Sequence, residues 1–354
     1  IETESSDVVE ARKVILELLL ARHKLECHTC ESDGICKLQD YCYRYGVKDS
    51  RFAGEGPDIY KDDPNPFIER DYNKCIMCTR CVRACEEITG AQAINVEDRG
   101  HHAVISTAFN GNLADSPCVF CGQCVMVCPV GALTSKVSAR KGKSYQVDKV
   151  LTTCTYCGTG CTFELNVKDD QIVGVTSVRD ENWSPVNRGA LCVKGRFGWD
   201  FVNSPERLTT PLIRENGELR PASWDEALDF AAGKLKELKE KYGPDAIAMC
   251  SSRRASIGEN YLSKKLMGAV IGTNDVDHCA RLLHSVTVAG LGAAFGSGAM
   301  TNSIGEIADA DFILTAGTNT FDAHPIIGIK IKQAVAKGAT LAVIDPRLTD
   351  SAKL

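Results

Sequence analysis

The cysteines carry the clearest chemistry in this sequence. Fifteen of the 18 fall into four groups, each spaced so that one loop can present several thiolates to one metal centre. Two groups share the spacing C-x2-C-x2-C-x3-C and contain Cys75, Cys78, Cys81 and Cys85, then Cys118, Cys121, Cys124 and Cys128, followed by Pro129. Pairs of cysteines with the spacing C-x2-C also suit tetrahedral zinc. Three successive cysteines, the fourth after three residues and the final proline favour 4Fe-4S clusters instead.

Together the two runs form a two-cluster, ferredoxin-like pattern, in which the fourth cysteine of each run ligates the cluster of the other run. One cluster is therefore expected on Cys75, Cys78, Cys81 and Cys128. The other is expected on Cys118, Cys121, Cys124 and Cys85.

An earlier group contains one histidine. The spacing H-x3-C-x2-C-x5-C is formed by His23, Cys27, Cys30 and Cys36. Because histidine replaces cysteine at some iron-sulfur centres and raises their potential, this group predicts a further 4Fe-4S cluster with one imidazole ligand. His28 is the alternative histidine. Cys42 fits no cluster and is expected to pack as a small buried hydrophobe.

A fourth group follows a basic, turn-rich linker at 136–149. It consists of Cys154, Cys157, Cys161 and Cys192. The segments 163–167 and 172–178 alternate as in a β-hairpin, which would bring Cys192 back beside the first three and complete a 4Fe-4S site. Lys194 stands just beyond Cys192, where a cation could bridge the cluster and the group that it reduces. An ordinary solvated lysine is the alternative.

After residue 211 the pattern changes to α/β. Ser223 and Glu226 predict a capping box before a helix that ends at Gly243-Pro244, and a short strand is expected at 246–250. Apolar runs at 312–316 and 340–344 flank a helical segment at 327–336, which predicts a βαβ unit with parallel strands. The carboxyl ends of such strands bind ligands. The turns there, which are candidates for binding a nucleotide-containing cofactor, consist of Gly317, Thr318, Asn319, Asp345, Pro346 and Arg347.

The expected fold is multidomain, with α+β and α/β parts. An amphipathic helix at 7–22 opens a helical His/Cys cluster domain at 1–66, which ends in a connecting loop at 54–66. A two-cluster ferredoxin-like domain is expected at 67–147 and a small β-rich cluster domain at 148–210. The α/β domain occupies 211–354.

The composition is that of a globular protein with more than one domain, since 44% of its 354 residues are hydrophobic. No apolar run is long enough to cross a bilayer, so membrane insertion is not expected. The formal net charge of −5 falls to roughly −12 once thiolates and oxidised cluster cores are counted, and no basic stripe is present, which argues against a nucleic-acid partner. Because cluster thiolates require a reducing compartment, the expected location is the cytoplasm.

The order of these motifs resembles the catalytic subunit of cytoplasmic, multi-cluster formate dehydrogenases of the molybdopterin oxidoreductase family. The cluster-bearing front end also resembles the large iron-sulfur subunit of NADH dehydrogenase. The resemblance implies that Lys194 lies between the last cluster and a bis-molybdopterin guanine dinucleotide, which the two turns would hold. It also implies that a preceding 2Fe-2S domain and later domains are absent from this chain, so that the α/β molybdopterin-type domain is incomplete.

The resemblance breaks at the expected molybdenum or tungsten ligand. The family has a cysteine or selenocysteine directly before a histidine, and Leu283 stands there in this chain. His284, which the resemblance implies handles the substrate proton, is kept. Cys279 would be one helical turn away, about 6 Å along the axis, and is a poor substitute.

Two functions follow from these motifs. The first is an iron-sulfur electron-transfer subunit of a formate-dehydrogenase-like complex, working with flavin- and iron-sulfur-containing NAD(P)H-oxidising subunits or with ferredoxin or hydrogenase subunits. The alternative is an active formate dehydrogenase subunit with a molybdenum or tungsten pterin centre. A structural or regulatory cluster protein is a third class, which a row of four clusters disfavours.

Overall fold

The computed structural model describes residues 2–52, 60–61, 64–139 and 141–354. It divides into two compact units, the first formed by Ile1–Ser204 with Ile304–Leu354 and the second by Pro205–Ser303. All four cysteine groups belong to the first unit, whereas Leu283 and His284 belong to the second. Most of the connecting loop expected at 54–66 lies outside the described residues.

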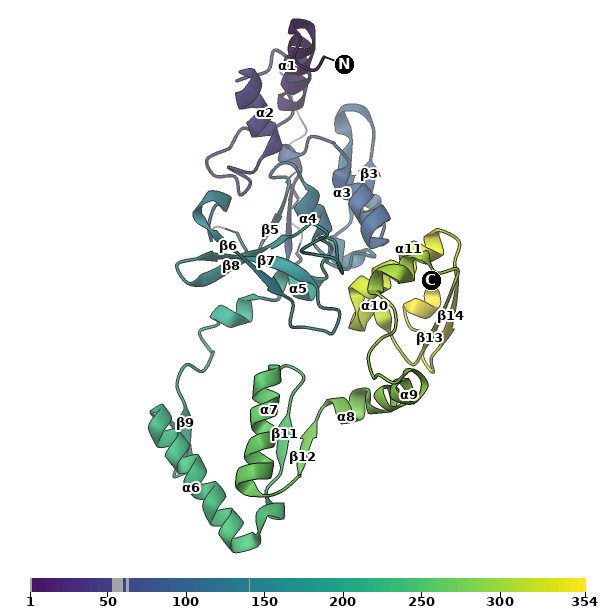
Figure 1. Cartoon of the computed structure of the whole chain (residues 1–354). Coiled ribbons are helices and arrows are strands. Elements are labelled where there is room, and N and C mark those ends of the chain that lie inside the picture. The colour runs from purple at the N-terminus through teal and green to yellow at the C-terminus, as the bar shows by residue number, and fades with distance from the viewer. Residues whose placement is uncertain (1, 53–59, 62–63, 140) are drawn as a thin grey trace. The chain divides into compact units, whose positions relative to one another are not determined.

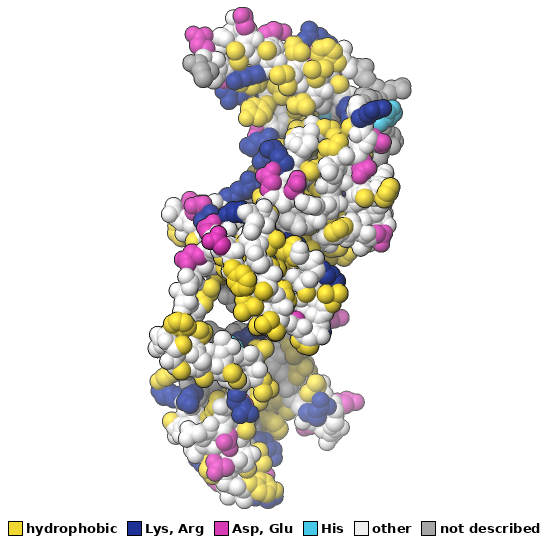
Figure 2. Space-filling model, turned by 90° about the vertical axis from the view of Figure 1, so that its right-hand side faces the viewer, with side chains coloured by type: hydrophobic (Ala, Val, Ile, Leu, Met, Phe, Trp, Pro, Cys, Tyr) yellow, Lys and Arg dark blue, Asp and Glu magenta, His cyan; other side chains and the backbone are white. Residues whose placement is uncertain are grey.

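The first unit begins with two packed helices, α1 (Ser6–Leu20) and α2 (Lys37–Tyr45). The apolar stripe that predicted the first helix is confirmed, since Leu16 and Leu20 are buried in a cluster that also contains Leu38 and Val130. Cys42 is buried in the same cluster, as expected of a packing residue. These helices also carry exposed apolar side chains, namely Ile15, Leu18 and Tyr43. Figure 2 shows hydrophobic side chains scattered over the surface of the molecule.

The ferredoxin-like segment contains short strands and helices around a small core. Its elements are β1 (Tyr60–Lys61), β2 (Ile68–Asp71), α3 (Arg80–Arg83), the π-helix η2 (Ala84–Thr89), β3 (Asn95–Glu97), β4 (Val104–Ser106), α4 (Gln123–Val127) and β5 (Leu133–Ser135). Strands β1, β2 and β5 form one antiparallel sheet, and β3 and β4 form another. Strands β3 and β4 lie between the two cysteine runs in the sequence.

A three-stranded antiparallel sheet follows, made of β6 (Asp148–Thr153), β7 (Thr162–Lys168) and β8 (Gln171–Ser177). The predicted hairpin is therefore confirmed, and it is drawn beside α5 (Val193–Phe197) in Figure 1. Asn187 ties the loop before Cys192 to this sheet. Its side chain accepts from Thr162 N at 2.9 Å and donates to Thr162 O at 3.0 Å and to Ala190 O at 2.9 Å.

The last part of the first unit is the predicted βαβ unit. Strands β13 (Phe312–Ala316) and β14 (Thr340–Ile344) are parallel and have the expected bounds, with α10 (Thr320–Ala323) and α11 (Pro325–Ala336) between them. Ile326 and Ile329 of α11 pack into the same buried cluster as Cys161 and Leu191. This contact joins the C-terminal segment to the fourth cysteine group.

The second unit contains two small sheets and four helices in its described residues. Its elements are β9 (Leu212–Glu215), β10 (Glu218–Pro221), α6 (Trp224–Tyr242), β11 (Met249–Ser251), α7 (Ile257–Lys265), β12 (Val276–His278), α8 (Ala280–Leu283) and α9 (Ser285–Phe295). The 266–271 segment extends α7 as a π-helix. Strands β9 and β10 are antiparallel, and β11 and β12 are parallel.

Two expectations for this unit need correction. Ser223 does cap α6, but the Glu226 carboxylate pairs with Arg220 at 2.6 Å instead of closing a capping box. The box is formed by Ser256 and Glu259 at the start of α7. The strand expected at 246–250 begins only at Met249, because Pro244–Ala246 forms a 3-10 turn.

Among the described residues, no helix combines the length and the apolar character that a membrane crossing requires.

Replacing Asn187 should destabilise the first unit strongly. Asn187→Ala would leave the Thr162 backbone groups and the Ala190 carbonyl buried without partners, which should cost about 3 kcal/mol of unfolding free energy. Urea unfolding measures this. Asn166→Ala on β7 is the matched control, because among the described residues its amide bonds only the Thr176 hydroxyl, and its cost should stay below about 1 kcal/mol. Equal costs would contradict the role of Asn187.

Candidate functional site

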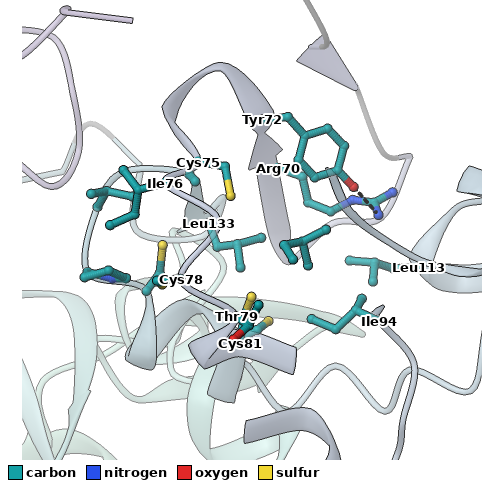
Figure 3. Close-up of a pocket in the computed structure, with 16 residues that line it drawn as sticks. Arg70, Tyr72, Cys75, Ile76, Cys78, Thr79, Cys81, Ile94, Leu113 and Leu133 are labelled. Carbon is teal, nitrogen blue, oxygen red and sulfur yellow. Dashed lines mark hydrogen bonds between the residues drawn. The ribbon is translucent and has the colours of Figure 1, made fainter. Parts of the chain in front are cut away.

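Three cysteines of the first run and the last cysteine of the second run surround one pocket. Its lining includes Cys75, Cys78, Cys81 and Cys128, together with Cys124 and apolar side chains. Figure 3 shows the first three of these side chains around the space, with Arg70 and Tyr72 on another side of it. Burial and, after it, neighbouring thiols raise the pKa of Cys81 from 9.0 to about 12. Those thiols belong to Cys128, Cys75 and Cys78.

A second gathering of thiols lies next to the first. Burial raises the pKa of the Cys124 thiol well above its ordinary value, and four neighbouring thiols add to this effect. They are Cys121, Cys118, Cys81 and Cys85. The structure thus brings Cys85 of the first run beside the second run, and Cys128 of the second run beside the first. Cys81 and Cys124 line the same pocket, so the two gatherings adjoin.

The two runs share one loop geometry. Met77 and Thr79 in the first run have positive φ angles, and so do Phe120 and Gly122 at the matching positions of the second. Positive φ is costly for residues other than glycine, so three of these four positions are strained. The strained turn aims backbone N–H groups at sulfur: Met77 N donates to Cys75 Sγ at 3.4 Å, and Phe120 N donates to Cys118 Sγ at 3.4 Å.

The histidine-containing group also gathers around a pocket. His23, Cys27, Cys30 and Cys36 line it together with Lys74 and Gly131. Cys30 Sγ lies so close to Gly131 that a Cβ there would collide with the sulfur. The glycine after Pro129-Val130 therefore leaves room for a thiol from another segment. His28 is not among the residues that line this pocket; it lines a neighbouring one with His23 and Cys27.

The His23 ring is held with one nitrogen unused. The ring bonds the backbone of Lys74, and burial lowers the pKa of His23 despite that bond. Its Nδ1 is buried and has no hydrogen-bond partner. A neutral imidazole with one nitrogen bonded to the backbone and a free lone pair on the other is the usual state of a metal-ligating histidine.

The fourth group gathers at the open end of the β6–β8 sheet. Burial and the neighbouring thiols raise the pKa of Cys161 from 9.0 to about 12, and those thiols are Cys154, Cys157 and Cys192. Cys154 N donates to Cys161 O at 2.8 Å, which closes the loop that carries three of the four. Burial also raises the pKa of Cys154, against an opposing contribution from the Lys194 charge.

Lys194 lies between this group and the C-terminal βαβ unit. Its Nζ donates to Asp322 O of α10 at 3.3 Å. Together with Cys192, Cys121 and Phe321 it lines a cavity of about 560 Å³. Lys194 therefore contacts α10, the helix that follows the first candidate cofactor turn. In the sequence it stood out only by its position near Cys192.

The two candidate cofactor turns are adjacent. Gly317 N donates to Ile344 O at 2.8 Å, which joins the carboxyl ends of β13 and β14. Gly317 has a φ of 63°, and apart from its chain neighbours no atom of the described residues lies within 4 Å of where its Cβ would be. Asn319 Oδ1 is buried without a hydrogen-bond partner. An open left-handed glycine beside an unsatisfied buried acceptor fits a site that contacts a polar ligand.

The second turn is ordered by Asp345. Its side chain is 6% exposed and accepts from Arg347 N at 2.9 Å, while the Arg347 guanidinium stays 75% exposed. Pro346 stands between them, and Thr318 stands between Gly317 and Asn319 in the first turn.

The remaining candidate residues belong to the second unit. Leu283 is the last residue of α8, and Leu283 N donates to Cys279 O at 3.2 Å, so the two lie one helical turn apart as expected. His284 follows and is the N-cap residue of α9.

All 18 cysteines lie in the described residues, and none is in a disulfide. In the described part of the chain no three His, Cys, Asp or Glu side chains are close enough to hold a single metal ion. That criterion concerns one ion, whereas the ligands of a four-iron cluster stand further apart around it.

Four segments of the chain match known protein families. Residues 207–354 match the family described as Molybdopterin oxidoreductase, and residues 147–204 match the Molybdopterin oxidoreductase Fe4S4 domain. The chain belongs to the molybdopterin oxidoreductase family. Its front end also carries iron-sulfur segments of another kind. Residues 12–51 match the NADH-ubiquinone oxidoreductase-G iron-sulfur binding region, and residues 65–134 match the ferredoxin-like domain of NADH-quinone oxidoreductase subunit 3.

Curated relatives of this oxidoreductase include proteins of Staphylococcus aureus whose names assign them provisionally as formate dehydrogenases. Those of strains bovine RF122 / ET3-1 and MSSA476 are each 36% identical to it over an alignment of 375 residues. The alignments cover 94% of this chain and 38% of the relatives. The chain thus spans well under half the length of these relatives.

Solved structures with partial similarity include a NAD+-reducing nickel-iron hydrogenase in the H2-reduced state, with 31% identity and a TM-score of 0.37 over 39% of this chain and 59% of that one. Acetylene hydratase from Pelobacter acetylenicus has 24% identity and a TM-score of 0.46 over 58% of this chain and 28% of that one.

The stability of the cluster-free oxidoreductase should fall as pH rises. The folded-state pKa of Cys81 and Cys161, about 12, lies above the ordinary 9.0, so the folded chain keeps protons that the unfolded chain releases. The stability that these thiols contribute is fully present below about pH 9 and is lost between about pH 9 and 12. Iron-bound thiolates no longer titrate, so the iron-loaded protein should lack this dependence. Urea unfolding of the cluster-free and iron-loaded forms at about pH 7.5 and 10 measures the unfolding free energy. An equal change of this free energy with pH in both forms would contradict the argument.

Proposed function

We propose that the chain is an iron-sulfur electron-transfer subunit of a formate-dehydrogenase-like oxidoreductase complex, and that it passes electrons through four 4Fe-4S clusters. The observation that carries this proposal is the proximity of cysteines that are distant in the sequence. Cys128 lies near Cys81, and Cys85 lies near Cys121. A ferredoxin-like pair of clusters requires this proximity.

The proposed ligands form four sets. They are Cys75, Cys78, Cys81 and Cys128; Cys85, Cys118, Cys121 and Cys124; His23, Cys27, Cys30 and Cys36; and Cys154, Cys157, Cys161 and Cys192. The burial that raises the thiol pKa values supports this proposal, because buried thiolates are favourable only when a metal compensates their charge. The backbone N–H groups aimed at Cys75 and Cys118 support it further, since hydrogen bonds to sulfur stabilise a cluster in its reduced form.

The adjoining turns at β13 and β14 are proposed to contact a bis-molybdopterin guanine dinucleotide with molybdenum or tungsten. When bound, such a cofactor supplies two-electron redox chemistry. The open space at Gly317 and the unsatisfied Asn319 Oδ1 support contact with a polar group there, and Asp345 fixes the neighbouring turn. Lys194 would hold a positive charge between this site and the fourth cluster, because it contacts α10 and faces Cys154.

The proposed partners are flavin- and iron-sulfur-containing subunits that oxidise NAD(P)H, or ferredoxin or hydrogenase subunits. The NADH dehydrogenase-type segments at 12–51 and 65–134 support this class of partner. The proposed location is the cytoplasm, since the cysteines must remain reduced.

The alternative function is an active formate dehydrogenase subunit. The provisional names of the curated relatives favour it, and so does His284, which would accept the substrate proton. Leu283 opposes it, because a leucine offers no lone pair to a metal.

The cluster assignment predicts about sixteen iron atoms per chain. Cys128→Ser should remove about four of them, and the EPR signal that it abolishes should be the one that Cys78→Ser also abolishes. Cys42→Ser is the matched control and should keep all sixteen, because Cys42 belongs to no set. Anaerobic iron and sulfide assays with EPR measure both effects. If Cys128→Ser abolished only the EPR signal that Cys121→Ser abolishes, the crossed ligation would be wrong.

The role of Leu283 separates the two functions. With molybdenum or tungsten bound, the chain should show little formate oxidation with an artificial acceptor, and Leu283→Cys should raise it, because a thiolate then ligates the metal beside His284. Leu282→Cys is the control, since it places a thiol one residue from the ligand position. Robust formate turnover by the unmodified, metal-loaded chain would favour the active enzyme instead.

A further inference from the structure

A buried arginine joins two of the proposed cluster sites. Arg196 belongs to α5, the helix that directly follows Cys192, and it is 3% exposed. Its side chain contacts the loop that holds Cys121. The thiol groups of Cys121, Cys124 and Cys192 are all close enough to act on its charge. The first two belong to one proposed cluster and the third to another, so this single guanidinium faces both.

Hydrogen bonds fix the guanidinium in this place. Its Nη2 donates to Gln123 Oε1 at 3.0 Å and to Ser177 Oγ at 2.7 Å, and its Nε lies 3.5 Å from Cys121 O. Gln123 is itself buried. Gly122 completes the contact, because a Cβ there would lie 2.8 Å from Arg196 Cγ. The arginine therefore cannot move toward solvent without separating the two loops.

The charge of Arg196 has no acidic partner. Within the described residues no carboxylate forms an ion pair with it, and its Nη1 is buried without a hydrogen bond. A guanidinium keeps its positive charge at neutral pH. A buried, unpaired cation is strongly unfavourable unless negative charge stands beside it. The negative charge that this position offers is that of the two proposed clusters, each about −2 with four thiolates and an oxidised core.

We propose that Arg196 is a positioning residue of the electron path, whose fixed positive charge raises the reduction potentials of the clusters on both sides of it. This inference rests on the proposed function, namely on the ligand sets of Cys85, Cys118, Cys121 and Cys124 and of Cys154, Cys157, Cys161 and Cys192. One electron leaves one cluster and enters the other, with no proton transferred. Arg196 stabilises the additional negative charge on either side, so it makes both clusters easier to reduce.

The test compares neutral and charged replacements. Arg196→Gln removes the charge and keeps a hydrogen-bonding side chain, and Arg196→Lys keeps the charge and loses the planar fork. Arg179→Gln is the matched control: Arg179 acts on Arg196 through its charge, but it is exposed, and its one hydrogen bond within the described residues is to Met126 O at 3.4 Å. Redox titration with dithionite, followed by EPR, gives the potential of each cluster in the assembled chain.

Arg196→Gln should lower the equilibrium constant for reduction of each of these two clusters at least tenfold, which is 59 mV for a one-electron couple. The potentials of the other two clusters should stay unchanged. Arg196→Lys and Arg179→Gln should each change the equilibrium constant less than threefold. Unchanged potentials in an Arg196→Gln protein with full iron would overturn the proposal, and so would an equal shift in Arg179→Gln. If Arg196→Gln loses iron, Arg196→Lys decides: unchanged potentials with full iron support the charge role, and lowered potentials or lost iron overturn it. The iron content of the unmodified chain separately tests the proposed function.

Discussion

Bringing so many thiols together inside apolar surroundings is the constraint on which the first unit depends. Burial raises the pKa of Cys81, Cys124 and Cys161, and neighbouring thiols raise it further, so the cluster-free chain holds these three cysteines as neutral, protonated groups. Iron reverses that preference, because it binds the thiolate and compensates its charge. The strained turns at Met77 and Phe120 follow from the same need, since they point backbone N–H groups at sulfur atoms.

The cores of the first unit are organised around these thiols. Cys81 lies in one buried cluster with Ile68 and Phe197, Cys161 in another with Leu191, and Cys36 in a third with Leu16. None of these cores is large. Small cores gain stability when a metal centre links their segments, because binding free energy then contributes to folding. Metal loading and folding are therefore coupled in the proposed protein, and Arg196 extends this coupling by leaving a buried positive charge for the clusters to neutralise.

The sequence predicted local features well where one physical signal dominated. The runs at 312–316 and 340–344 form strands with those bounds, and alternation located the hairpin of β7 and β8. Competing local interactions were harder to foresee. The Glu226 carboxylate pairs with Arg220 and does not cap the helix as expected, and the 3-10 turn at Pro244–Ala246 includes the first residue of the expected strand. Arg196 and Asn187 were missed because their importance comes from burial and from distant partners, and no spacing in the sequence reveals either. The gathering of the cysteines was foreseen because cluster ligation imposes its spacing on the chain, although the ligand sets remain proposals.

The discontinuity of the first unit has a consequence for its biosynthesis. Every proposed cluster ligand precedes Ser204, whereas the helix that packs beside Cys161, and Lys332, which donates to Gly90 O at 3.3 Å, come after residue 304. A ribosome adds about 5–20 residues per second, so the ligand loops emerge several seconds before the segment that covers them. During that interval the sites near Cys85, Cys121 and Cys161 are open to the machinery that delivers clusters. Once residues 304–354 pack against these loops, they would restrict later access to the proposed clusters.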